Sequence, residues 1–116
     1  MIQGACIMKL LSRHEEMILA AIWKLQKNAY GMAIRAEIEK VTGVKMQFGS
    51  IYTPLARLLE KGLISSREGE PSPRRGGRRK IFYHLSDRGK KALLAIHQLE
   101  KAIWTDMPSL ETNGIK

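Results

Sequence analysis

Apolar residues recur at intervals of three and four positions in four separate stretches of the chain. This is the spacing of an α-helix that buries one face and exposes the other, so the pattern predicts four helices. They cover LSRHEEMILAAIWKLQ (11–26), YGMAIRAEIEKVTG (30–43), GSIYTPLARLLEKG (49–62) and SDRGKKALLAIHQLEKAIWTDM (86–107). The predicted inward faces of the first three carry Ile18, Ile22 and Leu25, then Ile34, Ile38 and Val41, then Ile51, Leu55, Leu58 and Leu59.

Residues at the predicted helix ends support these boundaries. Ser12 and Glu15 have capping-box spacing, in which each side chain accepts a hydrogen bond from a free backbone amide. Ser86 is expected to cap the last helix in a similar way. Gly43 and Gly62 stand where the second and third helices are expected to stop, because glycine readily takes the left-handed conformation of a helix C-terminus.

Two features leave the geometry of the third helix open. Ser50 can cap its start, but the helix can also begin earlier, near Gln47. Pro54 lacks a backbone N–H. It is tolerated in a first turn and bends a helix when it lies deeper, so its effect depends on where the helix begins.

Between the third and fourth helices the pattern changes to the alternation of β-strands. LISSREG (63–69) and KIFYHLS (80–86) flank a loop rich in proline and glycine, which predicts a β-hairpin. The segment PRRGGRRK (73–80) holds five cations, two glycines and no acid. A charge run is usually solvated surface. At the end of a hairpin, however, it is held out from the body of the protein, where it can contact a polyanion.

The composition fits a single domain with an anionic partner. The chain has 116 residues, of which 44% are hydrophobic, as in ordinary globular domains. The net charge of +9 favours nucleic acid or an anionic membrane surface. The single cysteine, Cys6, excludes an intrachain disulfide and fits a reducing cytoplasm. No stretch approaches the roughly 18 apolar residues of a membrane span, so no spanning segment is expected, and of the two anionic partners nucleic acid is predicted rather than a membrane.

The order of elements predicts a mainly α protein with a small β-hairpin. Three helices, a hairpin and a fourth helix form the plan of a winged helix-turn-helix domain with a C-terminal dimerisation helix. The predicted division is a flexible extension (1–9), a DNA-binding domain (10–86), a dimerisation helix (87–107) and a flexible tail (108–116). Either Met1 or Met8 can be the natural start. A coiled-coil spacing in the last helix predicts a dimer seam of Ala92, Ile96, Leu99 and Ile103.

Three segments resemble the PadR family of bacterial transcription regulators. They are YGMAIRAEIEK, FGSIYTPLARLLEKGLISSR and GGRRKIFYHLSDRGKKAL, and the resemblance extends from about Leu11 to Trp104. It implies a homodimeric repressor of the short branch of the family, with one C-terminal helix. A two-fold dimer in turn predicts a pseudo-palindromic site in double-stranded DNA. Many members carry proline directly after the tyrosine, whereas here Thr53 follows Tyr52 and Pro54 comes next.

In a winged helix the third helix lies in the DNA major groove and the hairpin reaches the flanking backbone or minor groove. The candidate DNA-binding residues are therefore Gln47, Ser50, Tyr52, Thr53 and Arg57 in the helix, and Arg74, Arg75, Arg78, Arg79 and Lys80 in the hairpin. The resemblance adds Tyr30, at a position that can contact phosphate in the family.

Each of several candidates has an ordinary structural alternative. Tyr52 either bonds a phosphate or packs its ring on the core, and Tyr30 either contacts phosphate or simply packs. Arg57 either touches DNA or pairs with an acid such as Glu60 or Glu37. Lys80 can lie along its strand and face solvent.

The remaining candidates concern an effector. Some PadR relatives bind flat aromatic molecules at the dimer interface, so the resemblance makes a small-molecule effector a candidate partner. Trp104, on the predicted dimerisation helix, either lines such a pocket or packs in the interface, and Trp23 invites the same question. The cations Arg88, Lys90 and Lys91 near the start of that helix either contact phosphate or aid solubility.

Catalysis is not expected. His14, His84 and His97 lie on three different elements without metal-ligand spacing, and no glycine-rich phosphate loop precedes a helix. No cofactor or metal is predicted. Two alternatives to a repressor remain: a winged-helix module that binds another protein, and a protein that binds structured RNA through the same charge.

Overall fold

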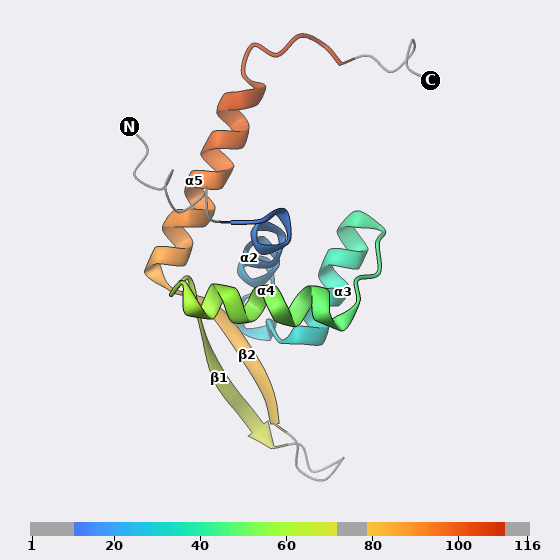
Figure 1. Ribbon diagram of the computed structural model, residues 1–116, viewed down its shortest axis with the longest axis vertical. Helices are drawn as coiled ribbons and strands as arrows, with labels where there is room; N and C mark the ends of the chain where they lie inside the picture. The colour runs from blue at the N-terminus through green and yellow to red at the C-terminus, as the bar shows by residue number, and fades with distance from the viewer. Residues whose placement is uncertain (1–10, 72–78, 111–116) are drawn as a thin grey trace.

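The computed structural model describes residues 11–71 and 79–110. Its elements, in chain order, are α2 (Arg13–Leu25), the 3-10 turn η1 (Gln26–Asn28), α3 (Gly31–Thr42), α4 (Phe48–Glu60), β1 (Ile64–Pro71), β2 (Arg79–Leu85) and α5 (Asp87–Trp104). The predicted order of three helices, a hairpin and a fourth helix is therefore confirmed. Figure 1 shows α5 and the hairpin extending in opposite directions from the group formed by α2, α3 and α4.

Helix α2 supplies the centre of the core. Ile18, Leu19 and Ile22 are almost completely buried, because α2 contacts α3, α4, α5 and β2. In Figure 1 it lies behind α4, between α5 and α3. The other large, fully buried side chains come from α3, α4 and the turn that follows α4, namely Ile34, Ile51, Leu55, Leu58 and Leu63. Among the described residues, no helix is both long and apolar enough to cross a bilayer.

The predicted capping box at the start of α2 is present. The Ser12 side chain accepts a hydrogen bond from the Glu15 amide, and the Glu15 carboxylate accepts one from the Ser12 amide. Glu15 is buried, and its second carboxylate oxygen lies 2.6 Å from Lys61 Nζ at the end of α4. The same carboxylate therefore caps the start of α2 and forms an ion pair with Lys61 at the end of α4.

The transition from α4 to β1 is also fixed by its sequence. Gly62 has a φ of 73°, and its N–H donates to the Leu59 carbonyl while that of Leu63 donates to the Leu58 carbonyl. This is the hydrogen-bond pattern of a Schellman motif, which glycine can adopt without strain. The predicted stop at Gly43 is likewise confirmed, with a φ of 76°.

Helix α5 begins directly against this turn. Ser86 caps it as predicted, accepting from the Gly89 amide at 3.0 Å, and its hydroxyl donates to the Gly62 carbonyl at 2.7 Å. A side chain at Gly89 would overlap the Leu63 backbone, so only glycine allows the first turn of α5 to pack this closely. The direction of α5 is therefore set by the end of α4 and the start of β1.

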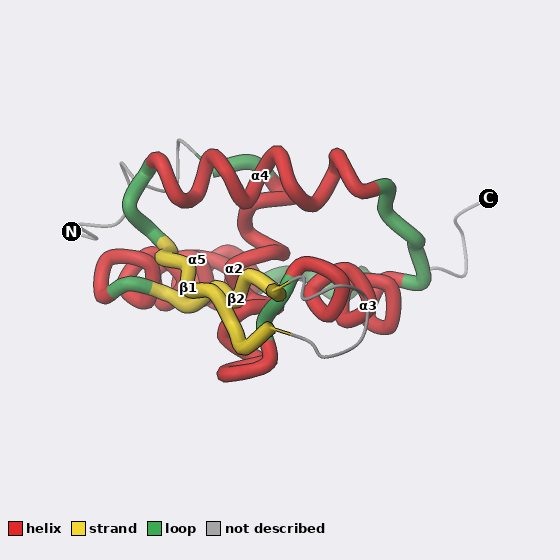
Figure 2. Tube along the Cα trace, turned by 90° about the horizontal axis from the view of Figure 1, so that it is seen from below, coloured by secondary structure: helices red, strands yellow, loops and turns green. Residues whose placement is uncertain are grey.

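The hairpin is antiparallel and is joined to the helical body at its base. Ile64 lies opposite Leu85, and the register becomes irregular between Glu68 and Pro71. The Tyr83 amide donates to the Ala29 carbonyl at 2.8 Å, just before α3. Seen from below, the hairpin lies in front of the helices because it extends toward the viewer, and α4 lies along the upper edge of the view (Figure 2).

Three details differ from the sequence prediction. Val41, expected to face inward, is 66% exposed, because the last turn of α3 leaves it uncovered, and Leu59 is 37% exposed. The last helix ends at Trp104 rather than Met107. Thr105 takes an extended conformation, and Pro108 follows three residues later.

Candidate nucleic-acid interface

The helix-turn-helix is held together by an arginine that links α3 to the start of α4. Arg35 donates from Nε to the Met46 carbonyl at 2.5 Å, and its guanidinium carbon lies 4.9 Å from the centre of the Phe48 ring. Arg35 was not among the predicted site residues. Nothing in the local pattern marks it, because both partners lie across the turn.

Helix α4 presents a continuous exposed face. Its residues recur at helical spacing and share one side of the helix, opposite Ile51, Leu55 and Leu58: they are Phe48, Gly49, Tyr52, Thr53, Ala56, Arg57 and Glu60. Three predicted DNA-binding residues, Tyr52, Thr53 and Arg57, lie on this face. Of the other two predicted for this helix, Gln47 is exposed at its N-cap, whereas Ser50 is half-buried.

The start of α4 decides the position of Pro54. Of the two predicted starts, the earlier one is correct, since the helix begins at Phe48 with Gln47 as its cap. Pro54 is therefore the seventh helical residue and is buried. It has no N–H to donate to the Ser50 carbonyl, yet the helix continues to Glu60.

Tyr52 both packs and remains exposed. Its ring lies over Gly31, where any side chain would collide with it, while 44% of the residue is accessible. Burial raises the pKa of the nearby Tyr83, and the phenol of Tyr52 raises that pKa further. Tyr52 of α4 therefore lies close to both Gly31 of α3 and Tyr83 of β2.

Arg57 does not pair with Glu37, one of the acids considered for it. The Glu37 carboxylate lies 2.7 Å from Lys24 Nζ instead, so its ion pair joins α3 to α2 and not to α4. Hydrogen bonding by Lys24 lowers the pKa of Glu37, so this carboxylate stays ionised. Arg57 is exposed on the last turn of α4.

Aromatic rings and cations stack where the hairpin meets the start of α3. The rings of Tyr30 and Phe82 meet edge to face with centres 5.6 Å apart. Lys80 Nζ lies 4.2 Å from the centre of the Tyr30 ring, and the guanidinium of Arg67 lies 4.7 Å from that of Phe82. Tyr30 thus packs against the hairpin, and Lys80 stands over its ring while remaining exposed.

Only part of the predicted cationic run is described. Arg79 is exposed and pairs with Glu68 on the opposite strand at 3.1 Å. The predicted residues Arg74, Arg75 and Arg78 lie outside the described residues. In the described part of the chain, no group of His, Cys, Asp and Glu side chains could hold a metal ion.

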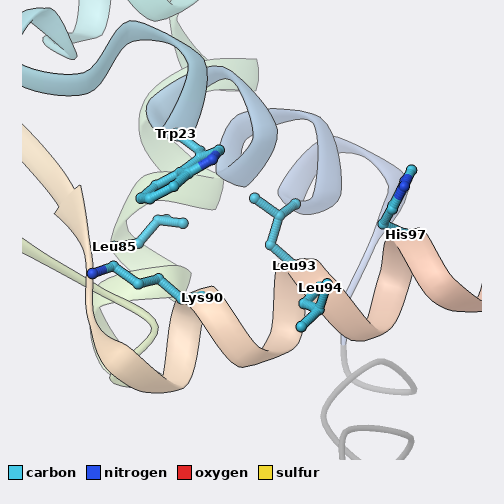
Figure 3. Close-up of a pocket in the computed structure, with 6 residues that line it drawn as sticks. All are labelled: Trp23, Leu85, Lys90, Leu93, Leu94 and His97. Carbon is cyan, nitrogen blue, oxygen red and sulfur yellow. The ribbon is translucent and has the colours of Figure 1, made fainter.

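A pocket of about 440 Å³ lies between α2 and α5. Figure 3 shows Trp23 on one side and Leu93 and Leu94 on the other, with Lys90 at one end and His97 at the other. Lys90 Nζ lies 5.7 Å from the centre of the Trp23 ring. Trp104, the predicted pocket residue, is not part of this lining and is 55% exposed near the end of α5.

The predicted dimer seam divides into two parts. Ala92 has no exposed surface and belongs to the core of its own protomer, and Ile96 is half-buried. Leu99 and Ile103 are 39% and 54% exposed. Every residue from His97 to Trp104 is exposed, because this half of α5 extends beyond the other helices (Figure 1).

Comparison with known proteins identifies the fold and the family. Two of the solved structures with a similar fold match most of this chain. A PadR family transcription regulator from Clostridium difficile is 25% identical, with a TM-score of 0.67, and the match covers 83% of this chain and 95% of that one. A PadR-like transcriptional regulator from Bacillus cereus is 26% identical, with a TM-score of 0.66, and the match covers 79% and 84%.

No curated protein matches the chain. The sequence model of the transcriptional regulator PadR-like family, in contrast, matches residues 18–95, from the first turns of α2 to the middle of α5. This match covers the helix-turn-helix, the hairpin and the junction with α5. The chain belongs to the PadR-like family of transcriptional regulators.

Proposed function

We propose that this regulator is a homodimeric repressor that binds a pseudo-palindromic site in double-stranded DNA. The observation that carries the proposal is the exposed face of α4, which is the second helix of a helix-turn-helix and has no covering element in the described chain. In helix-turn-helix proteins the corresponding helix enters the major groove, with its N-terminal residues at the base edges.

The exposed face suits this task. Gly49, Thr53 and Ala56 are small, so the backbone of α4 can approach another surface closely. Tyr52 and Arg57 add a hydroxyl and a guanidinium that can bind phosphate or base edges. Gln47, at the N-cap, offers an amide of the kind that pairs with adenine.

The hairpin supplies sequence-independent attraction. Arg79 and Lys80 are exposed at its described end, next to the predicted cations Arg74, Arg75 and Arg78. Because the Tyr30 and Phe82 rings join the hairpin to the start of α3, Lys80 lies beside the helix-turn-helix, with its Nζ 4.2 Å from the centre of the Tyr30 ring. Each cation that neutralises a phosphate releases a counterion, so binding weakens as salt rises.

A variant pair tests the contribution of the hairpin. Lys80→Ala removes a cation from the hairpin, and Lys101→Ala removes one from the far half of α5 as a control. We expect Lys80→Ala to weaken binding to all duplexes and to lower the slope of log affinity against log salt by about 1. A slope equal to that of the wild type and of Lys101→Ala would remove the hairpin from the proposal.

Dimerisation is assigned to the second half of α5. Leu99, Ile103 and Trp104 leave apolar surface exposed on a segment whose ion pair to the rest of the described protomer is that of Glu100 with Arg13, at 3.6 Å. Pairing with the same segment of a second copy would bury it, and two-fold symmetry would match an inverted repeat in DNA.

Leu99→Asp tests this assignment, with Gln98→Asp as the control that adds the same charge one position away. We expect Leu99→Asp to halve the mass in solution by light scattering. An unchanged mass would contradict the dimer. A cytoplasmic location in a bacterium completes the proposal.

A further inference from the structure

Phe48 is a large aromatic residue that the fold leaves on its surface. It is the first residue of α4 and is 56% exposed. Neither the helix-turn-helix nor the hairpin uses it for packing in the interior. Its position at the N-terminal end of α4 is the one from which such helices contact base edges.

The ring is held in place while it remains exposed. The Arg35 guanidinium lies 4.9 Å from its centre on one side, and the Tyr52 ring lies 6.4 Å away at an angle of 31°. Arg35 is itself fixed by its hydrogen bond to the Met46 carbonyl. A binding surface gains from such an arrangement, because a side chain ordered in advance loses little entropy when it binds.

The surroundings of the ring fit a polyanion better than an apolar protein surface. Arg35 places positive charge beside it, Lys45 is exposed three positions earlier in the chain, and the chain as a whole carries a net charge of +9. Next to Phe48, Gly49 has open space where a side chain would stand, so a partner can approach closely. An aromatic ring beside positive charge suits a partner that is anionic overall and apolar at one point.

The DNA major groove has this combination. Its only apolar group at the base edges is the 5-methyl group of thymine, and phenylalanine is one of the side chains that contact it. We propose that Phe48 is a specificity-determining residue that packs against a thymine methyl group in each half-site. This inference rests on the proposed DNA binding and adds the base that α4 selects.

Deoxyuridine tests the inference, because it lacks only the methyl group of thymine. The probe is the duplex that the protein enriches from a random pool, with each thymine replaced in turn by deoxyuridine. We expect wild-type protein to lose roughly fourfold in affinity at one thymine of each half-site, the effect of one buried methyl group. Phe48→Ala should bind the thymine duplex less tightly and should no longer distinguish it from the deoxyuridine duplex.

Two controls separate this outcome from general damage. Val44→Ala shortens an exposed apolar side chain in the adjoining turn, and Tyr52→Phe removes a hydroxyl from the same face while keeping the ring. Both should retain the discrimination, and thermal unfolding of all variants checks that they fold. Discrimination that persists in Phe48→Ala would overturn the inference and leave DNA binding intact. It would point to a protein partner for the ring. If wild-type protein enriches no duplex, the proposed function itself fails.

Discussion

Gly31 and Gly49 lie at the first turns of α3 and α4, and the same substitution should affect them in opposite ways. A methyl group at Gly31 would lie 2.6 and 2.8 Å from two carbons of the Tyr52 ring, whereas one at Gly49 would have no atom within 4 Å. Nonbonded carbons prefer a separation of about 3.5 Å or more. In Gly31→Ala the Tyr52 ring must therefore move by roughly 1 Å.

The cost of Gly31→Ala follows from this displacement. Overpacking of this kind usually costs about 1–3 kcal/mol, and the better helix propensity of alanine offsets about 0.5–1 kcal/mol of it. We expect a net loss of about 1–2 kcal/mol in the free energy of unfolding, and a weaker DNA affinity because Tyr52 is displaced. Gly49→Ala should instead keep or slightly raise stability while lowering DNA affinity, since its methyl group projects from the proposed DNA-binding face.

Both effects can be measured on the same samples. Urea denaturation gives the free energy of unfolding, and fluorescence anisotropy of a labelled duplex gives the affinity. The reasoning about Tyr52 is refuted if Gly31→Ala unfolds at the same urea concentration as wild type. The placement of DNA on α4 is refuted if Gly49→Ala binds the duplex with unchanged affinity.

Two further substitutions test the contacts that set the positions of the helices. Gly89→Ala would place a methyl group against the Leu63 carbonyl, which cannot move aside as a side chain can. We expect it to destabilise the protein by at least about 3 kcal/mol in urea denaturation, and a loss below 1 kcal/mol would contradict the close packing of α5. Burial alone would raise the pKa of Glu15, but the hydrogen bond from Lys61 and the other contacts of the carboxylate outweigh it and hold the pKa below its ordinary value of 4.5. Stabilisation by this carboxylate is therefore complete at neutral pH and is lost as the pH falls below 4.5 through the lowered pKa. Glu15→Gln should cost about 1–3 kcal/mol at pH 7 and should reduce the loss of stability on acidification, whereas an unchanged pH profile would contradict the assignment.

The elements were predictable where the deciding contacts are local in sequence. The capping box of Ser12 and Glu15, the turn at Gly62 and the cap at Ser86 each join residues that are three to five positions apart. Such contacts depend on neighbouring residue types alone, so a single sequence contains the information.

The misplaced residues show what a local pattern lacks. Val41 keeps the helical spacing of Ile34 and Ile38, but whether it is covered depends on how far α2 extends beside α3. Ala92 has the spacing of a dimer seam, and the same spacing also serves packing within one protomer. Periodicity predicts which side of a helix is apolar, but it does not predict which part of the protein, or which partner, covers that side.

The same limit applies to the candidate interface. Tyr52, Thr53 and Arg57 could be assigned to the exposed face because the helical period places them opposite the core. The contacts of Arg35 with Met46, Tyr30 with Phe82 and Tyr52 with Gly31 could not, because each joins residues that come together only when the helices pack. The exposure of Phe48 is not predictable from the pattern either, since phenylalanine is ordinarily among the most buried residues.

Selection of bound fragments from a random DNA pool, at two salt concentrations, tests the central claim most directly. The account predicts an enriched inverted repeat that persists at the higher salt, with half-sites about one helical turn or a multiple of it apart. Binding that disappears at the higher salt without an enriched sequence would contradict it, because α4 would then read no bases and only the attraction between positive charge and phosphate would remain.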